Sequence, residues 1–258
     1  MRIALTIAGS DSGGGAGIQA DLKTFQRFGV FGTSVITAIT AQNTLGVRAW
    51  EAVSIELITA QLEAVVTDLR PHAVKTGMLA DATVVEAVAR GIRHHALARY
   101  VLDPVMVASS GDRLLSEDAV GAIRDQLLPL ARLVTPNLDE AALMLGEPVT
   151  DVASMERAAR TLVDAGAHAA LVKGGHLTGP QVTDLLFDGV AVRTFCHPKL
   201  GTTSTHGTGC TLSSAIAAQL ALGVPLDQAV ERSLDFVHRA IAHAPGLGSG
   251  HGPLNHLA

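Results

Sequence analysis

Aromatic and charged residues are both scarce in this sequence. Of its 258 residues, 3% are aromatic and 17% are Asp, Glu, Lys or Arg. Few aromatics leave little material for the base stacking on which single-strand nucleic-acid binders depend. The net charge of −5 also argues against a basic footprint, so we expect no nucleic-acid partner.

Long apolar runs are missing as well. The longest, such as residues 215–222, are far shorter than the roughly 20 residues of a membrane-spanning helix. Met1 opens an ordinary strand-like run without a cleavage motif, so we expect neither a signal peptide nor a membrane partner. The two cysteines, Cys196 and Cys210, are then expected to be reduced thiols of a cytoplasmic protein.

The histidines show no metal-binding spacing. Eleven are present, but His94 and His95 are expected on different sides of a helix, and His238 and His243 lie five positions apart. A zinc enzyme is therefore not expected.

Strand-like and helix-like segments alternate along the whole chain. The predicted strands span residues 2–9, 33–40, 73–78, 100–106, 132–137 and 168–175, and a hairpin is predicted over 184–195. The predicted helices span residues 16–28, 55–69, 82–94, 138–145, 156–165, 208–222 and 226–244. Apolar strands separated by helices predict an α/β fold with a parallel sheet covered on both faces. No linker or repeat divides residues 1–258, which are expected to form one domain.

A glycine-rich loop, "GSDSGGGAGIQAD", follows the first predicted strand over residues 9–21. It lacks the Lys-Ser/Thr of a phosphate-binding P-loop. "GAGIQA" fits a loose dinucleotide pattern, but the next strand ends without the acidic residue that would bind the ribose. A flexible connection is the alternative. Asp21 lies inside the following helix, where most aspartates are solvated or favour the helix dipole.

Gln42 directly follows the predicted strand 33–40. Its amide offers a donor side and an acceptor side, which match a ring nitrogen next to an exocyclic amine. Loop capping is the commoner use of such a residue.

Two further segments carry polar side chains at strand ends. In "TPNLDEAALMLG", Asn137 and Glu140 have the spacing of a capping box. The same spacing places two oxygen ligands on one helical turn, which suits hydrated magnesium. In "LVKGGH", Lys173 ends a strand beside two glycines, where it could meet phosphate or simply extend to solvent.

The segment "TSTHGTGC" leads into a helix rich in Ala and Ser. The free N–H groups at that helix start, approached through glycines, predict an anion site. A helix N-terminus also lowers the pKa of a thiol, so Cys210 is a candidate thiolate or proton acceptor. The alternative is a small buried residue.

These segments together resemble one family. They are "AGSDSGGGAGIQADLKTF", "TAQNTLGV", "VKTGML", "DPVMVASSG", "TPNLDEA", "VKGGH", "STHGTGCTLSSAIAA" and "GHGPLNH". In this order they resemble the hydroxymethylpyrimidine and phosphomethylpyrimidine kinases of thiamine biosynthesis, within the ribokinase-like superfamily. The resemblance spans nearly the entire chain. It implies a three-layer αβα sandwich with a mostly parallel sheet and no separate lid domain.

The resemblance also implies an activity and a set of site residues. The expected enzyme uses ATP and Mg²⁺ to phosphorylate 4-amino-5-hydroxymethyl-2-methylpyrimidine, and then its monophosphate. The residues it assigns to the substrate are Gly9, Asp21, Gln42, Met78 and Val105. It assigns the nucleotide to Lys173, Asn137 and Thr208, and the metal to Asn137 and Glu140. It assigns catalysis to Cys210, Lys173, Gly207 and Gly209. Cys210 stands where sugar kinases of the superfamily have an aspartate base. A cytoplasmic homodimer is expected, although the sequence itself does not determine the oligomeric state.

Three other functions remain open from the sequence. Pyridoxal kinase is the nearest, because vitamin B6 alcohols also carry a hydroxymethyl arm on a ring. The motif "GAGIQA" is compatible with a dinucleotide-dependent oxidoreductase. The absence of a ribose-binding acidic residue after the next strand argues against that function. A non-catalytic pyrimidine-binding protein would have no use for Lys173, Asn137, Glu140 and Cys210.

Overall fold

The computed structural model describes residues 1–106 and 117–258. Within these residues eight strands form one sheet in the order β10-β9-β8-β7-β6-β5-β1-β2. The strands are β1 (Ile3–Ala8), β2 (Phe31–Ile36), β5 (Ala73–Thr76), β6 (Tyr100–Leu102), β7 (Leu133–Val134), β8 (Ala170–Val172), β9 (Gln181–Phe187) and β10 (Val192–Pro198). All pairings from β2 to β8 are parallel, whereas β9 and β10 add an antiparallel hairpin at the edge. The mostly parallel sheet is therefore confirmed.

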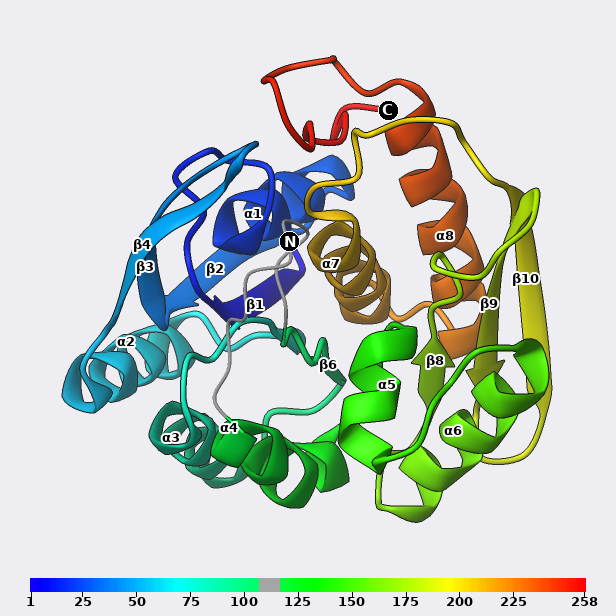
Figure 1. Cartoon of the computed structure of the whole chain (residues 1–258). Coiled ribbons are helices and arrows are strands. Elements are labelled where there is room, and N and C mark those ends of the chain that lie inside the picture. Colours follow the sequence, from blue (N-terminus) through cyan, green and yellow to red (C-terminus); the bar gives the residue numbers. More distant parts are fainter. Residues whose placement is uncertain (107–116) are drawn as a thin grey trace.

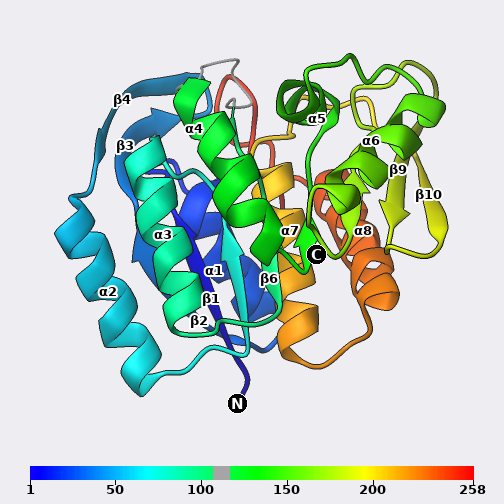
Figure 2. The same ribbon diagram turned by 90° about the horizontal axis from the view of Figure 1, so that it is seen from below.

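Helices cover both faces of this sheet (Figures 1 and 2). One face carries α1 (Gly17–Arg27), α7 (Thr208–Ala221) and α8 (Leu226–Ala242). The other carries α2 (Ile55–Asp68), α3 (Ala82–His94), α4 (Glu117–Ala122), α5 (Leu138–Leu145) and α6 (Val152–Asp164). Each face has its own apolar core, one including Ile58 and Leu162 and the other Phe25 and Ile216. This is the expected three-layer αβα arrangement.

Helix α7 is almost entirely buried, and its ribbon lies near the centre of the view in Figure 1. Its side chains are mostly Ala, Ser, Leu and Ile, so it is apolar or small on every side. A helix of that kind packs within the protein rather than on its surface. Burial fixes α7 firmly, and its first turn lies at the site described below.

Polar caps set several helix starts. The Asp81 carboxylate accepts the Val84 N–H at the start of α3. The Asp151 carboxylate accepts the Ser154 N–H, so α6 begins at Val152. The sequence-based start at residue 156 was therefore wrong by four positions, because the cap lies upstream of the apolar repeat.

The predicted strand 33–40 is divided in two. β2 ends at Ile36, and β3 (Ala38–Asn43) pairs antiparallel with β4 (Gly46–Ala52) in a separate two-stranded sheet. The chain changes sheet at Thr37, whose N–H donates to the Ala8 carbonyl and whose hydroxyl donates to the Met78 carbonyl. β4 was not predicted, because it is largely exposed and lacks a buried apolar face. α4 and the helical segments that continue it to residue 130 were also missed.

None of the helices in the described parts of the chain combines the length and apolarity of a membrane span. The organisation of residues 1–258 as one domain stays a prediction. Residues 107–111 of the motif "DPVMVASSG" lie outside the described residues.

Candidate active site

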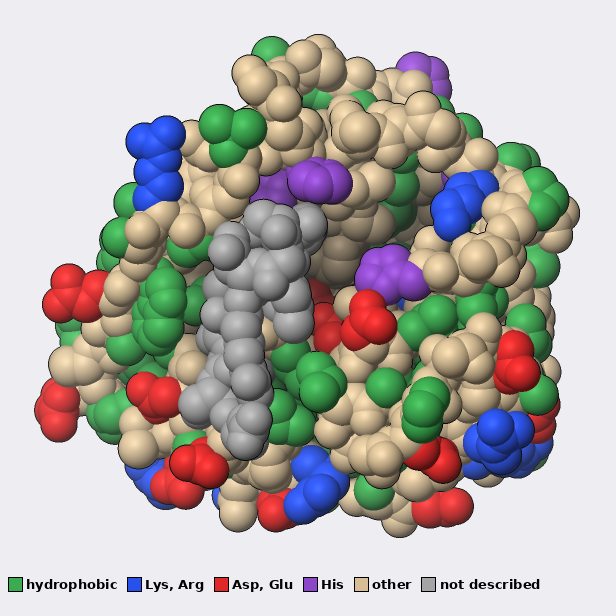
Figure 3. All heavy atoms as spheres, in the orientation of Figure 1, with side chains coloured by type: hydrophobic (Ala, Val, Ile, Leu, Met, Phe, Trp, Pro, Cys, Tyr) green, Lys and Arg blue, Asp and Glu red, His purple; other side chains and the backbone are tan. Residues whose placement is uncertain are grey.

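A cavity of about 790 Å³ opens at the carboxyl ends of the parallel strands. Figure 3 shows this face hollowed, with histidine side chains at the rim. Such an edge is where open α/β sheets bind ligands. The sequence-predicted site residues that line it are Gly9, Gln42, Met78, Val105, Asn137, Glu140, Lys173, Gly207, Thr208, Gly209 and Cys210. Asp21 is not among the lining residues.

The charged end of the cavity centres on Lys173. Its Nζ lies 3.4 Å from Asp103 Oδ1 and 3.6 Å from Glu140 Oε2, and its side chain is 15% exposed. Burial lowers the pKa of Lys173, but the charges of Asp103 and Glu140 more than offset this, so the pKa ends above its ordinary value. Lys173 therefore stays positively charged at the cavity wall rather than extending freely to solvent.

Asn137 and Glu140 form the capping box of α5. The Asn137 side-chain oxygen accepts the Glu140 N–H at 2.8 Å, and Glu140 Oε2 accepts the Asn137 N–H at 2.7 Å. Burial raises the pKa of Glu140 to about 7, and the charge of Lys173 opposes that rise. The predicted capping box is therefore present, and its Glu140 carboxylate also lines the cavity beside Lys173.

The first turn of α7 lies beside Lys173. Gly207 has φ +80°, and a side chain there would collide with the Gly15 carbonyl, so only glycine suits the position. A Cβ added to Gly209 would lie 3.3 Å from Lys173 Nζ, which places this turn directly beside the lysine. Within the described residues, the N–H groups of Gly209 and Cys210 have no hydrogen-bond acceptor. Free amides and a cation together form an anion site.

Cys210 is the third residue of α7 and lies in this first turn. Burial raises the pKa of its thiol to about 11, and the positive charge of Lys75 opposes the rise. The expectation of a lowered pKa at the helix start was wrong, because desolvation outweighs the helix terminus and Asp21 and Asp103 add negative charge. The thiol is protonated at rest.

Asp21 lies beneath the cavity and is completely buried. Its carboxylate accepts both Thr6 Oγ1 and Ser214 Oγ at 2.6 Å and forms an ion pair with Lys75 Nζ at 3.0 Å. The solvated alternative is therefore wrong for this aspartate. Asp21 does not line the cavity, and its side-chain partners Thr6, Ser214 and Lys75 are all buried. The structure therefore gives Asp21 no direct contact with a substrate in the cavity.

The other end of the cavity is less polar. Met78 and Val105 pack around Ala38, and a Cβ at Gly9 would lie 3.2 Å from the Met78 sulfur. Glycine at position 9 therefore lets Met78 and Ala38 pack closely against the backbone at this apolar wall. The Gln42 side-chain amide nitrogen lies 3.5 Å from His206 Nε2, at the same mouth.

Sequence reasoning missed Asp103, Asp11 and His206. Asp103 is 1% exposed, accepts the Ser213 hydroxyl at 3.0 Å, and lines the cavity. Its position after β6 in an Asp-Pro pair was the available signal. The Asp11 carboxylate accepts the N–H groups of Gly13, Gly15 and Ala16 and lies 2.8 Å from His206 Nε2.

Burial tends to raise the pKa of Asp11, but the His206 contact and these amides bring it below its ordinary value. The glycine-rich loop is therefore a fixed structure, not a flexible connection.

The family profile and the most similar relatives place this chain in one family, and a pyridoxal kinase shares its fold. The family profile described as "Phosphomethylpyrimidine kinase" matches residues 11–255. The hydroxymethylpyrimidine/phosphomethylpyrimidine kinase of Rhizobium meliloti (strain 1021) is 56% identical over 99% of this chain and 97% of its own length. The crystal structure of phosphomethylpyrimidine kinase from Clostridium difficile 630 has a TM-score of 0.84 at 41% identity, covering 93% of this chain and 100% of that one. The Bacillus subtilis pyridoxal kinase in its ADP complex has a TM-score of 0.93 at 37% identity, covering 99% and 97%.

Proposed function

This chain belongs to the phosphomethylpyrimidine kinase family, and we propose that it phosphorylates an aminopyrimidine alcohol twice at the expense of ATP. The first product is the monophosphate of 4-amino-5-hydroxymethyl-2-methylpyrimidine and the second is the diphosphate, for thiamine biosynthesis. The observation that carries the proposal is one cavity with two unlike ends. Lys173, Glu140 and free α7 amides form one end, and Gln42, Met78 and Val105 form the other.

The charged end suits the terminal phosphate of ATP. Phosphoryl transfer needs mainly positioning and stabilisation of charge on the transferred group. The N–H groups of Gly209 and Cys210 would donate to its oxygens, and Lys173 would balance their charge. Thr208 lines the same turn and is assigned to the nucleotide. The substrate oxygen forms a bond to the γ-phosphorus as the bond from phosphorus to the ADP oxygen breaks.

The residues at this end also fit a magnesium ion. Mg²⁺ prefers oxygen ligands, and Glu140 and Asp103 supply buried carboxylates. Burial raises the pKa of Glu140, so a nearby cation would stabilise the ionised form of this carboxylate. We infer that Glu140 and Asn137 hold the ion, the latter through the lone pair its cap bond leaves free. When bound, the ion neutralises phosphate charge.

Cys210 is assigned to the proton of the substrate alcohol. Only its thiolate can accept that proton, and the raised pKa makes the thiolate a minor species. Lys75 lies beneath it and favours the thiolate, while Asp21 holds Lys75 in place. Asp21 is therefore a positioning residue in this proposal. In the second step the acceptor is an ionised phosphate, which needs no base.

The opposite end is assigned to the pyrimidine. The Gln42 amide would form hydrogen bonds with the ring nitrogen and its neighbouring amine, and Met78 and Val105 would contact the ring face. Gly9 gives the ring access to the backbone. The pyridoxal kinase of Bacillus subtilis shares this fold, so a B6 alcohol is the second candidate substrate.

A coupled ADP-release assay tests the proposal. The hydroxymethyl pyrimidine, its monophosphate and pyridoxal are compared in parallel, each with Mg-ATP. ADP release with both pyrimidines and little with pyridoxal is expected. Release with pyridoxal alone would assign the site to B6 alcohols, and no release with any substrate would contradict a kinase.

We also infer a homodimer. Ile39 on β3 is 51% exposed and Trp50 on β4 is 45% exposed. Because Ile39 pairs with Glu51 and Trp50 with Thr40, each face of the two-stranded sheet carries one large apolar side chain that is open to solvent. Light scattering after size exclusion should give twice the 26.6 kDa chain mass, and a monomer mass would contradict the inference. The cytoplasmic location and the absence of a nucleic-acid partner stay predictions.

A further inference from the structure

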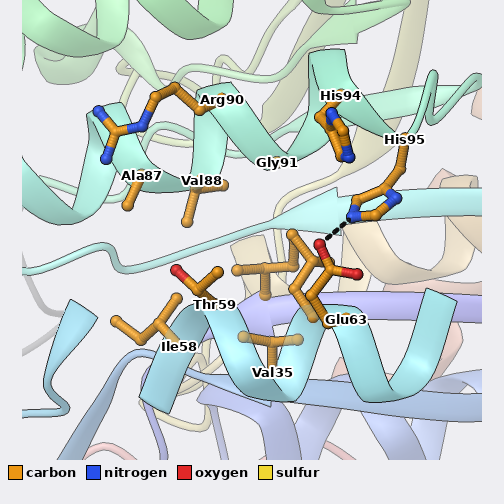
Figure 4. A pocket seen from close by; sticks show the side chains of 12 residues that line it. Val35, Ile58, Thr59, Glu63, Ala87, Val88, Arg90, Gly91, His94 and His95 are labelled. Carbon is orange, nitrogen blue, oxygen red and sulfur yellow. Dashed lines mark hydrogen bonds and ion pairs between the residues drawn. The ribbon is translucent and has the colours of Figure 1, made fainter. Parts of the chain in front are cut away.

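Three possible metal ligands meet between helices α2 and α3, away from the kinase cavity. They are Glu63 on α2, His94 at the last position of α3, and His95 at its C-cap. One ligand atom from each lies within 4.8 Å of the other two. Figure 4 shows His94 above His95, with the Glu63 carboxylate below and bonded to His95. None of the three lines the larger cavity.

The two histidines meet because the helix ends between them. Neighbouring positions on a continuous helix point in directions about 100° apart. α3 stops at His94, His95 has cap geometry with φ −89° and ψ 3°, and Ala96 turns the chain with φ +48°. The ring centroids are therefore only 4.7 Å apart. The expectation that these histidines point to different sides was wrong.

We propose that Glu63, His94 and His95 bind a divalent cation of the zinc class. Two imidazoles and one carboxylate suit Zn²⁺, which is commonly held by three protein ligands with a fourth position open to water. His95 Nε2 lies 3.0 Å from Glu63 Oε1. Two ligands on one tetrahedral ion, each about 2.0–2.2 Å from it, are separated by roughly 3.3–3.6 Å. This pair is thus already near the spacing the ion requires.

His94 must close only a short gap. Its side chain is exposed, so rotation can bring its ring nitrogen toward the other two ligands without repacking the core. His95 is anchored, with its side chain 12% exposed, whereas the Glu63 side chain is 48% exposed. The site therefore has one fixed ligand and two adjustable ones, and water can reach the ion.

The surrounding helices hold the ligands in register. A Cβ at Gly91 would collide with the Leu62 side chain, so α3 approaches α2 closely just one turn before the histidines. A cavity of about 280 Å³ adjoins the ligands and has Ile58 and Val88 among its lining residues. Arg90 also lines this cavity, and its Nη1 lies 3.9 Å from Glu86 Oε2, which partly offsets its charge. Figure 4 shows Arg90 directed away from the histidines.

The bound ion would join α2 to the end of α3. Because it binds the folded chain, it should raise the unfolding temperature increasingly as the free ion concentration exceeds its Kd. For a domain of this size, Zn²⁺ at a hundredfold excess over its Kd should raise Tm by about 5–10 °C. The kinase cavity shares no ligand with this site, so ADP release should be unaffected by its loss.

Calorimetric titration of the chelator-treated, dialysed full chain with ZnCl₂ tests the proposal. A saturable site that depends on Glu63 and His94 is expected, accompanied by the rise in Tm; the magnesium site proposed at Glu140 and Asn137 is unaffected by changes at these two residues. Glu63→Gln and His94→Ala should each weaken binding at least about tenfold, which at the same Zn²⁺ concentration removes about half of that rise or more. His168→Ala, a change at another exposed histidine, is the matched control and should bind like the wild type. Far-UV circular dichroism and ADP release confirm that each variant is folded and active.

Substitution with Co²⁺ gives a second measurement that does not depend on stability. Coordination by imidazole and carboxylate should give a visible absorption band that His94→Ala removes. Absence of a saturable site would overturn the proposal. Equal Zn²⁺ affinity in the wild type, Glu63→Gln and His94→Ala would overturn it too, since the ion would then lie elsewhere, for example at the thiols.

Discussion

Replacing Cys210 with alanine separates the two phosphorylations. The alcohol of the first substrate must lose a proton, whereas the monophosphate is already ionised. General bases contribute about 10²–10⁴-fold to such steps. The Cys210 pKa of about 11, against an ordinary 9.0, leaves about 100-fold less thiolate at neutral pH. We therefore expect kcat for the first step to fall by about 10²-fold, the low end of that range, and kcat for the second step to change little.

The assay measures ADP release with saturating Mg-ATP and either the alcohol or the monophosphate. Cys210→Ser serves as the matched control, because a hydroxyl preserves the size of the side chain but ionises far less readily than a thiol. It should resemble Cys210→Ala in the first step. Alkylation by iodoacetamide, followed over pH, checks the pKa itself. Cys196 is exposed and provides the internal reference within the same chain.

Equal losses in both steps would refute this reasoning and leave Cys210 as a structural part of the anion site. An alkylation midpoint for Cys210 at or below that of Cys196 would refute the argument from burial. Cys210 could alkylate readily at neutral pH while Cys210→Ala still slows only the first step. That result would support Cys210 as the general base but would contradict its raised pKa.

Four further outcomes are expected. Gln42→Leu should raise KM for the pyrimidine while leaving KM for ATP unchanged, since the amide lies beside His206, whereas Lys173 lies between Asp103 and Glu140. An equal rise for ATP would contradict the assignment of Gln42 to the pyrimidine. Lys173→Met should lower kcat by about 10²–10³-fold, because it removes a transition-state cation, and an unchanged kcat would exclude that role. Asn137→Ser should keep Tm, because serine also caps helices, but should lower kcat if the amide serves the nucleotide or its metal. Burial raises the pKa of Asp184 to about 6 from 3.8. Between about pH 4 and 6 the folded carboxyl therefore keeps a proton that the unfolded chain has lost, so the free energy of unfolding falls as pH rises through this range. Asp184→Asn should flatten this part of the pH–stability curve in urea melts, and an unchanged curve would contradict the raised pKa.

The sequence predicted the fold class because apolar strands alternate with amphipathic helices. That pattern depends on local spacing, and β1, α1, α2, α3 and α5 lie within about two residues of their predicted bounds. It failed where burial and periodicity were weak. β4 is exposed, and the change of sheet at Thr37 depends on hydrogen bonds to distant segments.

The candidate site divides in the same way. Loop motifs at strand ends identified Lys173, Asn137, Glu140 and the first turn of α7, because strand ends of a parallel sheet meet at one edge. Their electrostatics could not be read from the sequence. A helix N-terminus suggested a thiolate at Cys210, and burial beside Asp21 and Asp103 reverses that direction.

Residue types and their spacing along the chain therefore determined the layers of this protein and the loops that carry its chemistry. Only the tertiary structure decided which charges face one another. It placed Asp21 against Lys75, inserted Asp103 beside Lys173, and brought Glu63 to two histidines from another helix. The physical reason is that propensity and hydrophobic period act over a few neighbouring residues, whereas desolvation and Coulomb interactions depend on distances between segments far apart in sequence.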